Sequence, residues 1–268
     1  MDEARGIAEE IVSLIDGGAE PKDIAILFRA NFQSRALEEA LLTLRIPYQV
    51  LGTRFFDRKE VKDLLSYLKS AVNSDDRIAL ARALVSPTRG IGAVTLDHIS
   101  SGREEELSEK TKEKLTQFRA LLAKIKQKAV EGTVKEALSI ALSESGMIES
   151  YAKDPMGEER IENLQELINL AAKYDVMRGE DAISTFLADT TLASDQDSLE
   201  KNYNAVRLMT VHASKGLEFP YVFVSGLEHD LFPHKAMMSE ENGDRDEEER
   251  RLFYVAITRA EKKLFLSY

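Results

Sequence analysis

The 268-residue chain has no cysteine and no tryptophan, and none of its apolar runs approaches the ~18 residues needed to cross a bilayer. Without cysteine it forms neither disulfides nor thiolate metal sites, which fits a reducing compartment, so we expect a cytoplasmic protein with no membrane partner. The acidic opening, MDEARGIAEE, lacks the pattern of a secretory signal. The histidines are not closely paired, so the sequence predicts no metal site: they are His98, His212, His229 and His234.

The chain also lacks an excess of basic residues. Its 36 lysines and arginines are outnumbered by 47 aspartates and glutamates, which gives a formal net charge of −11. Modules that bind nucleic acid usually carry a basic footprint. Screening limits the field of each charge to about 8–10 Å at physiological salt, so an acidic chain can still contain a local positive groove. We therefore expect any binding of nucleic acid by this chain alone to be weak.

The hydrophobic pattern divides the chain into an α/β part and an all-helical part. At both ends, short apolar runs that suit buried strands alternate with helical periods, which indicates a parallel sheet covered on both faces. The expected strands span residues 24–28, 48–51, 221–225 and 263–266, with a further one from Val206, and the expected helices span 4–15, 33–44, 58–72 and 246–259. Between residues 95 and 192 only helical periods occur. We therefore predict an α/β domain built from residues 1–88 and 204–268, with an all-helical domain inserted at 89–203.

Two segments near the C-terminus end an apolar pattern abruptly in charged and small polar residues, which is how chains present chemical groups at the edge of a sheet. They are Val206–Pro220 (VRLMTVHASKGLEFP) and Glu247–Ala260 (EEERRLFYVAITRA). In the second segment, Arg259 shares a narrow helical arc with three apolar residues: Leu252, Val255 and Ala256. Spacing alone leaves two roles open for Arg259. It is either a snorkelling partner of the helix dipole or an arginine held at a cleft to meet phosphate charge.

Together these two segments resemble the fifth and sixth helicase motifs of the UvrD/PcrA/Rep family, the superfamily-1 DNA helicases. The resemblance covers nearly the whole chain and includes Ile24–Arg35 (IAILFRANFQSR), Gly52–Asp63 and Ser86–Gly92 (SPTRGIG). It implies a RecA-like motor domain with an inserted helical domain. The chain contains no G-x-x-x-x-G-K-[ST] phosphate loop. We therefore expect the chain to be the C-terminal half of an ATP-dependent 3′–5′ DNA helicase that acts in repair or replication. The N-terminal motor domain of that helicase would supply the phosphate loop. The fragment alone is expected to be a monomer.

The resemblance further implies a nucleotide site shared with the N-terminal motor domain. Arg259 matches the family arginine that reaches the γ-phosphate of ATP. Glu218 matches the glutamate that binds the ribose hydroxyls, and a carboxylate suits this task because it can accept two hydrogen bonds from a diol. Gly216 would permit a tight turn beside it. The expected cofactor is ATP with Mg²⁺, whose phosphate loop and magnesium ligands lie in the N-terminal domain, so none is expected to bind this chain alone.

Other matched positions lie on the DNA side in the family. His212, with Thr210 beside it, and His234 match residues near single-stranded DNA, where an imidazole can bond a phosphate or stack on a base. Arg29 and Asn31 directly follow an expected strand, so both side chains can project from the sheet rim toward a backbone phosphate. We expect single-stranded DNA to run past these residues.

The segment Gly90-Ile91-Gly92 precedes an expected helix and would leave backbone amides free at the N-terminus of that helix. Such a turn binds phosphate without reading bases. The family uses this element to hold the duplex ahead of the fork, so the expected partner is a junction of duplex and single-stranded DNA. A plain turn between domains is the alternative.

Two other functions remain open. One is a non-catalytic interaction module that inherited the fold, which the acidic charge and the absent phosphate loop favour. The presence of Arg259, Glu218 and His212 argues against it, because folding alone does not require all three. The other is a subunit of a recombination helicase-nuclease, although SPTRGIG and EEERRLFYVAITRA fit the UvrD/PcrA/Rep group better.

Overall fold

The computed structural model describes residues 2–195, 204–229, 231–233 and 243–268. It contains two compact units. The first, the sheet unit, combines Met1–Phe55 with Leu199–Tyr268, and the second, the helical unit, contains Phe56–Ser198. Within the described ranges, no helix is long and apolar enough to cross a membrane.

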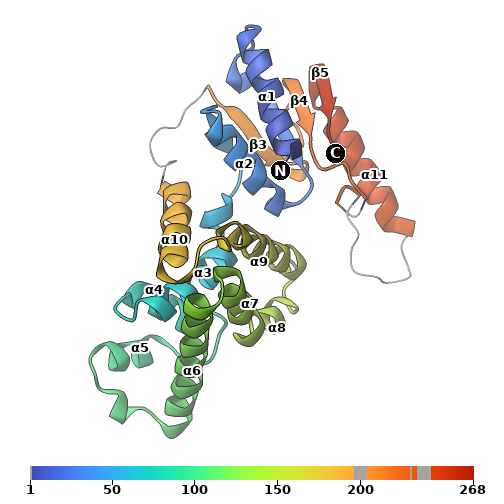
Figure 1. Cartoon of the computed structure of the whole chain (residues 1–268). Helices are drawn as coiled ribbons and strands as arrows, with labels where there is room; N and C mark the ends of the chain where they lie inside the picture. Colours follow the sequence, from blue (N-terminus) through green and yellow to red (C-terminus); the bar gives the residue numbers. More distant parts are fainter. Residues whose placement is uncertain (1, 196–203, 230, 234–242) are drawn as a thin grey trace. The chain divides into compact units, whose positions relative to one another are not determined.

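The sheet unit is built on five parallel strands in the order β2-β3-β1-β4-β5 (Figure 1). The strands are β1 (Ile24–Phe28), β2 (Tyr48–Val50), β3 (Val206–Thr210), β4 (Phe219–Val224) and β5 (Ala260–Leu266). The central strand is β1, and all five of its residues are buried, which explains its uniformly apolar sequence. In register, Ile26 lies between Leu208 of β3 and Phe223 of β4. The expected α/β class with a parallel sheet is confirmed.

Alternate residues of the strands point to opposite faces, and helices cover both faces. On one face, Ile24, Ile26 and Phe28 pack with α1 (Asp2–Asp16) and α2 (Ser34–Thr43). On the other face, Ala25 and Leu27 pack in a cluster with Leu252 and Ala256 of α11 (Gly243–Ile257). The apolar stripe that the sequence placed on this last helix therefore does face the core.

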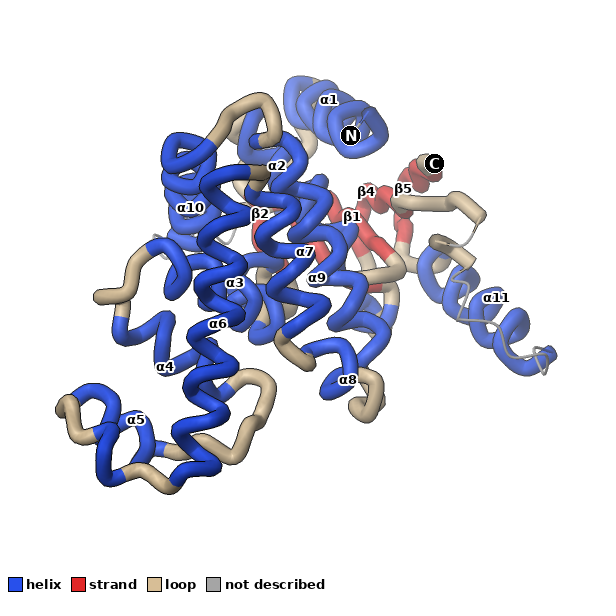
Figure 2. Tube along the Cα trace, turned by 60° about the horizontal axis from the view of Figure 1, so that its bottom comes forward, coloured by secondary structure: helices blue, strands red, loops and turns tan. Residues whose placement is uncertain are grey.

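The helical unit contains no strand among its described residues. Its helices are α3 (Lys59–Val72), α4 (Arg77–Val85), α5 (Ala93–Ser100), α6 (Glu109–Glu131), α7 (Val134–Glu144), α8 (Met147–Tyr151), α9 (Gly157–Ala171) and α10 (Gly179–Asp195). In Figure 2, α3, α6, α7 and α9 lie side by side, in agreement with their packing. The start of α7 is a capping box, in which Thr133 Oγ1 accepts from Glu136 N at 3.1 Å and Glu136 Oε2 accepts from Thr133 N at 3.2 Å.

The first border between the units differs from the expected one. The sequence analysis assigned residues 1–88 to the α/β domain, whereas the structure divides at Phe55 and Phe56. The reason is the apolar stripe of α3, which includes the fully buried Leu64 and Leu68 and packs against α4, α6, α7 and α9. The expected second border, at residues 203 and 204, adjoins residues 196–203, which lie outside the described residues.

Candidate functional site

Four of the residues expected to bind DNA follow the ends of neighbouring strands, and we call them the strand-end group: Arg29, Asn31, Thr210 and His212. Strands β1 and β3 pair in parallel with Phe28 level with Thr210, so the residues after both strands lie at one edge of the sheet. His212 is exposed and begins a 3-10 turn, His212–Ser214. Thr210 Oγ1 supports that turn by accepting a hydrogen bond from Ala213 N at 3.3 Å. The fifth expected DNA residue, His234, lies outside the described residues.

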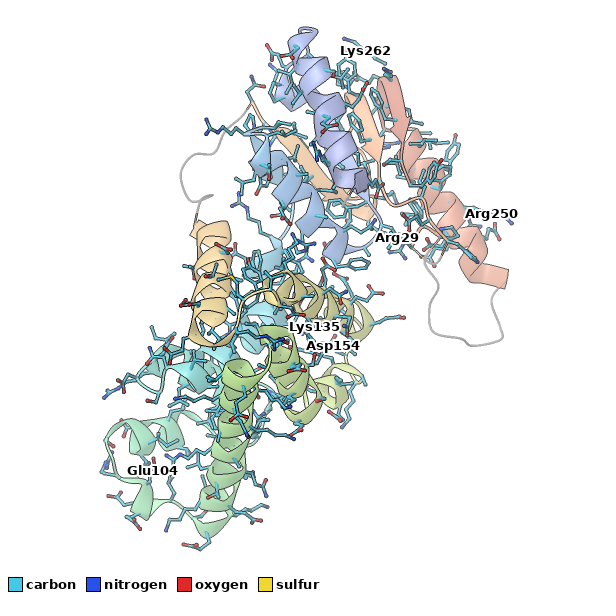
Figure 3. All side chains as sticks on the ribbon, in the orientation of Figure 1. Arg29, Glu104, Lys135, Asp154, Arg250 and Lys262 are labelled. Carbon is cyan, nitrogen blue, oxygen red and sulfur yellow. The ribbon has the colours of Figure 1, made fainter. Side chains whose placement is uncertain are left out.

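Arg29, labelled in Figure 3, is bound by a carboxylate of the same unit. Its Nη2 lies 2.7 Å and its Nε 2.9 Å from Oε1 of Glu249 on α11. The side chains are 24% and 11% exposed, so this pair is largely withdrawn from solvent. The sequence analysis expected Arg29 to project toward a phosphate and gave Glu249 no role. A phosphate that reaches Arg29 therefore meets a guanidinium whose charge Glu249 already offsets.

The residues expected at the nucleotide, Gly216, Glu218 and Arg259, are brought together, and we call them the Arg259 group. Arg259 Nη1 donates to Leu217 O at 2.9 Å, and the backbone oxygen of Arg259 accepts from Phe219 N at 2.9 Å. Glu218 thus lies between two residues that both hydrogen bond Arg259. Gly216 has φ +87°, which L side chains rarely adopt, so the turn before Glu218 does require glycine.

The Arg259 group has donors and an acceptor left for a ligand. Three of the five N–H groups of Arg259 are used, because Nε also donates to Val255 O at 3.0 Å and Nη2 to Thr258 Oγ1 at 2.9 Å. These bonds fix the guanidinium and leave two of its N–H groups without a partner among the described residues. Glu218 is exposed and bonds to none of the described residues. The donor set therefore fits an anion and a diol, as ATP would present. Within the described part of the chain, no three metal-ligating side chains gather.

The two groups lie at opposite edges of the sheet. Val206–Pro220 was expected to present its polar groups at an edge of the sheet. Thr210 and His212 lie at the edge where β3 ends, whereas Glu218 lies at the edge where β4 begins. Because β3 and β4 are parallel, the segment between them returns to the opposite edge, and Glu218 immediately precedes β4. In helix α11, Glu249 lies beside Arg29, and the helix ends at Ile257, two residues before Arg259.

The glycine turn, Gly90-Ile91-Gly92, belongs to the helical unit. Gly90 has φ +69°, Ile91 is buried at 5% exposure, and Gly92 precedes α5 in an extended conformation. Among the described residues, no acceptor is bonded to the three backbone amides of this turn. The turn is thus anchored by one apolar side chain and keeps its amides available.

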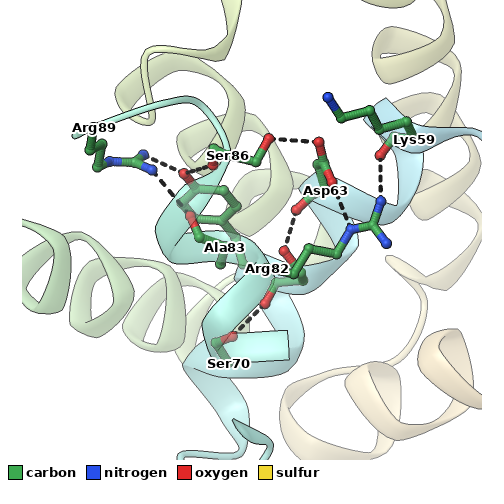
Figure 4. A network of polar contacts seen from close by, with 9 residues as sticks. Lys59, Asp63, Ser70, Arg82, Ala83, Ser86 and Arg89 are labelled. Atoms are coloured by element: carbon green, nitrogen blue, oxygen red, sulfur yellow. Dashed lines mark hydrogen bonds and ion pairs between the residues drawn. The ribbon is translucent and has the colours of Figure 1, made fainter. Parts of the chain in front are cut away.

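Arg89 fastens the segment that leads into the glycine turn (Figure 4). Its Nη1 donates to Ala83 O and Pro87 O, both at 3.1 Å, and its Nη2 donates to Ser145 O at 2.8 Å and to the Tyr67 hydroxyl. Burial raises the pKa of Tyr67, so its hydroxyl stays protonated and donates to Ser86 O at 2.6 Å.

A carboxylate of α3 supports the start of the same segment. Asp63, 2% exposed, accepts from Arg82 Nε and from Ser86 Oγ, both at 2.6 Å. The sequence analysis quoted Arg89 within SPTRGIG without giving it a role. No sequence signal singles out Arg89 or Glu249, because each has a partner that lies far away in the chain: Ser145 is 56 residues from Arg89, and Glu249 is 220 residues from Arg29.

Comparison with known proteins gives concordant matches. A family model described as UvrD-like helicase C-terminal domain matches residues 1–268. DNA helicase II of Escherichia coli is 38% identical over 290 residues, and that of Haemophilus influenzae is 37% identical over 290 residues; each match covers 100% of this chain and 40% of the relative. ATP-dependent DNA helicase PcrA of Staphylococcus epidermidis is 36% identical over 286 residues, covering 99% of this chain and 39% of the relative. The chain thus spans about two fifths of the length of these relatives.

Proposed function

Because the chain belongs to the family of UvrD-like helicase C-terminal domains, we propose that it is the C-terminal motor part of an ATP-dependent DNA helicase, whose nucleotide site the Arg259 group completes. ATP binds with Mg²⁺, and transfer of its γ-phosphoryl group to water drives such an enzyme. The phosphate loop and magnesium ligands would come from an N-terminal motor domain. By the same proposal, movement along DNA is 3′–5′ and serves repair or replication.

The observation that carries this proposal is the position of Glu218 between two residues that hydrogen bond Arg259. This position supports the proposal, because the Arg259 guanidinium, which can bind an anion, lies near a carboxylate that bonds to none of the described residues and can accept from a diol. Val255 O and Thr258 Oγ1 hold the guanidinium in place before any ligand arrives. Fixed donors of this kind act where charge develops in a transition state, because they need no reorganisation during the reaction.

The strand-end group is proposed to contact single-stranded DNA. Exposed His212 can bond a phosphate or stack on a base. The Glu249 carboxylate lowers the net charge at Arg29, so Arg29 adds orientation more than charge. This agrees with the weak binding that we expect from a chain of net charge −11. The glycine turn is proposed to hold duplex DNA by its amides.

An interaction module without catalytic role is the second candidate. The acidic composition favours it. The Arg259 group supports the first candidate, since an interaction module would not need two guanidinium N–H groups and a carboxylate that have no partner among the described residues.

The 268-residue chain assayed alone should neither hydrolyse ATP nor unwind DNA, because Arg259 and Glu218 cannot by themselves hold the β- and γ-phosphates. Phosphate release in the presence of single-stranded DNA measures the first activity. Steady hydrolysis by the pure chain that Arg259→Ala abolishes would refute the shared site.

Replacing Gly92 with leucine in the full-length protein should weaken binding to a duplex–single-strand junction by about tenfold, the equivalent of one hydrogen bond to a charged group. Gly92 can be replaced without backbone strain, because an added Cβ meets nothing within 4 Å and its φ is −112°. Gly90 has φ +69°, so a substitution there would strain the backbone. Fluorescence anisotropy with labelled junction and single-stranded oligonucleotides separates the two contacts.

Binding to the single strand should change little, since the strand-end group lies in the other unit. Gly6→Leu is the matched control, because Gly6 is exposed and an added Cβ there also meets nothing within 4 Å. Equal losses on both oligonucleotides would mean that Gly92→Leu damages the fold, and the duplex contact would be abandoned.

A further inference from the structure

We propose that Lys114 of α6 is a phosphate-binding residue that acts together with the glycine turn. The inference rests on the proposed contact between that turn and duplex DNA, and it adds a charged donor to the backbone amides of the turn. The ligand is a phosphodiester of the nucleic-acid backbone.

Lys114 reaches the glycine turn from a helix that is 25 residues away in the sequence. Its Nζ donates to Arg89 O at 2.6 Å. The same nitrogen lies 3.3 Å from the point where a Cβ on Gly90 would be, so a side chain at position 90 would press on the ammonium. The next residue of α6, Leu115, is buried at 3% exposure and anchors this part of the helix.

The cations at this turn are paired with neutral oxygens. Lys114 bonds a carbonyl, and Arg89 bonds carbonyls and the Tyr67 hydroxyl; among the described residues, no carboxylate forms an ion pair with either. The carboxylate that reaches this segment, Asp63, is bound by Arg82. Partly buried charges are usually paired. In a chain of net charge −11, two such cations at one turn indicate that an external anion completes the site.

Two other lysines of α6 differ from Lys114 in that each pairs with a carboxylate. Lys112 pairs with Glu109 at 3.0 Å, and Lys124 pairs with Glu144. Lys114 instead keeps two ammonium N–H groups beside the three amides of the glycine turn, which are bonded to no described acceptor. An ammonium beside backbone amides can bind phosphate oxygens, and these groups read no base.

The test distinguishes a Lys114 that binds phosphate from a Lys114 that only stabilises the turn. Lys114→Gln keeps a donor for Arg89 O and removes the charge. Lys128→Gln is the matched control, because Lys128 is exposed on the same helix, about 21 Å further along, and the variant changes net charge equally. Binding of each full-length variant to a duplex–single-strand junction is measured from about 50 to 200 mM salt. Thermal unfolding confirms that the fold is kept.

We expect the slope of log affinity against log salt to decrease in magnitude by about 0.9 in Lys114→Gln, the value for one lost phosphate contact, and to stay unchanged in Lys128→Gln. An unchanged slope in Lys114→Gln overturns the inference. If Gly92→Leu still weakens junction binding in that case, the glycine turn contacts duplex DNA and only the proposed role of Lys114 is wrong. If neither variant has an effect, the proposed duplex contact and the role of Lys114 are both wrong. Inorganic phosphate at constant ionic strength should not displace the junction, and displacement at low millimolar concentration would overturn the assignment to backbone phosphate.

Discussion

Replacing Arg259 with alanine in the full-length protein should lower the turnover number for ATP by about 10³–10⁵-fold, the range for arginines that meet transition-state charge in phosphoryl transfer. The effect falls on turnover because such an arginine acts mainly where charge develops. ATP affinity should fall much less. The variant also loses the 2.9 Å bond to Leu217 O, which steadies Glu218, and one such bond is worth about 1 kcal/mol, or roughly fivefold in affinity.

Steady-state hydrolysis at saturating ATP and single-stranded DNA gives the turnover number, and titration with a fluorescent nucleotide gives the affinity. Arg251→Ala is the control on the same helix. Arg251 is 75% exposed and pairs with Glu247 across one helical turn, an interaction worth about 0.3–0.5 kcal/mol, so its loss should leave both quantities unchanged. A collapse of ATP affinity with normal turnover at saturation would show that Arg259 binds the ground state instead.

Replacing Arg89 with methionine should destabilise the helical unit by about 3 kcal/mol. The guanidinium joins α4, the end of α7 and the Tyr67 hydroxyl of α3, and it also lies 5.6 Å from the Tyr67 ring centroid and 5.5 Å from that of Phe118. Methionine fills part of the same volume but donates no hydrogen bond. Partly buried carbonyls such as Ser145 O would lose their donor, at about 1–3 kcal/mol for each one that water cannot reach.

Hydrogen exchange of backbone amides in α3 and α4 measures this loss in the full-length protein, and amides of β1 report on the sheet unit. Arg103→Met is the matched control, because Arg103 is 48% exposed and its partners Asp97 and Ser101 are local; its effect should stay within about 0.5 kcal/mol. Similar protection of α3 in the two variants would show that Arg89 does not fasten the unit.

Local patterns carried much of the fold. Five consecutive apolar residues, Ile24–Phe28, predicted a buried strand, and this strand is the centre of the sheet. The helical period of residues 58–72 predicted α3 to within one residue. The same periodicity could not show in which unit α3 packs. An apolar stripe shows that one face of a helix is covered, but it does not show which elements cover that face. That is why the expected border at 88 differs from the division at Phe55.

The candidate site divides in the same way. Motif resemblance selected Arg259 and Glu218, and the structure brings them together; it also selected Arg29 but not Glu249, which binds it. The sequence by itself indicated the five strands, the helices near residues 4–15, 33–44, 58–72 and 246–259, the helical character of residues 95–192, the turn at Gly216, and the family resemblance. Only the tertiary structure decided that Glu218 lies at the opposite edge from Thr210, and that Arg89 and Lys114 meet at the glycine turn. The physical reason is the separation of the residues along the chain. Periodicity and turn preferences reflect residues a few positions apart, whereas the contacts of Arg89 and Lys114 join segments that only tertiary packing brings together.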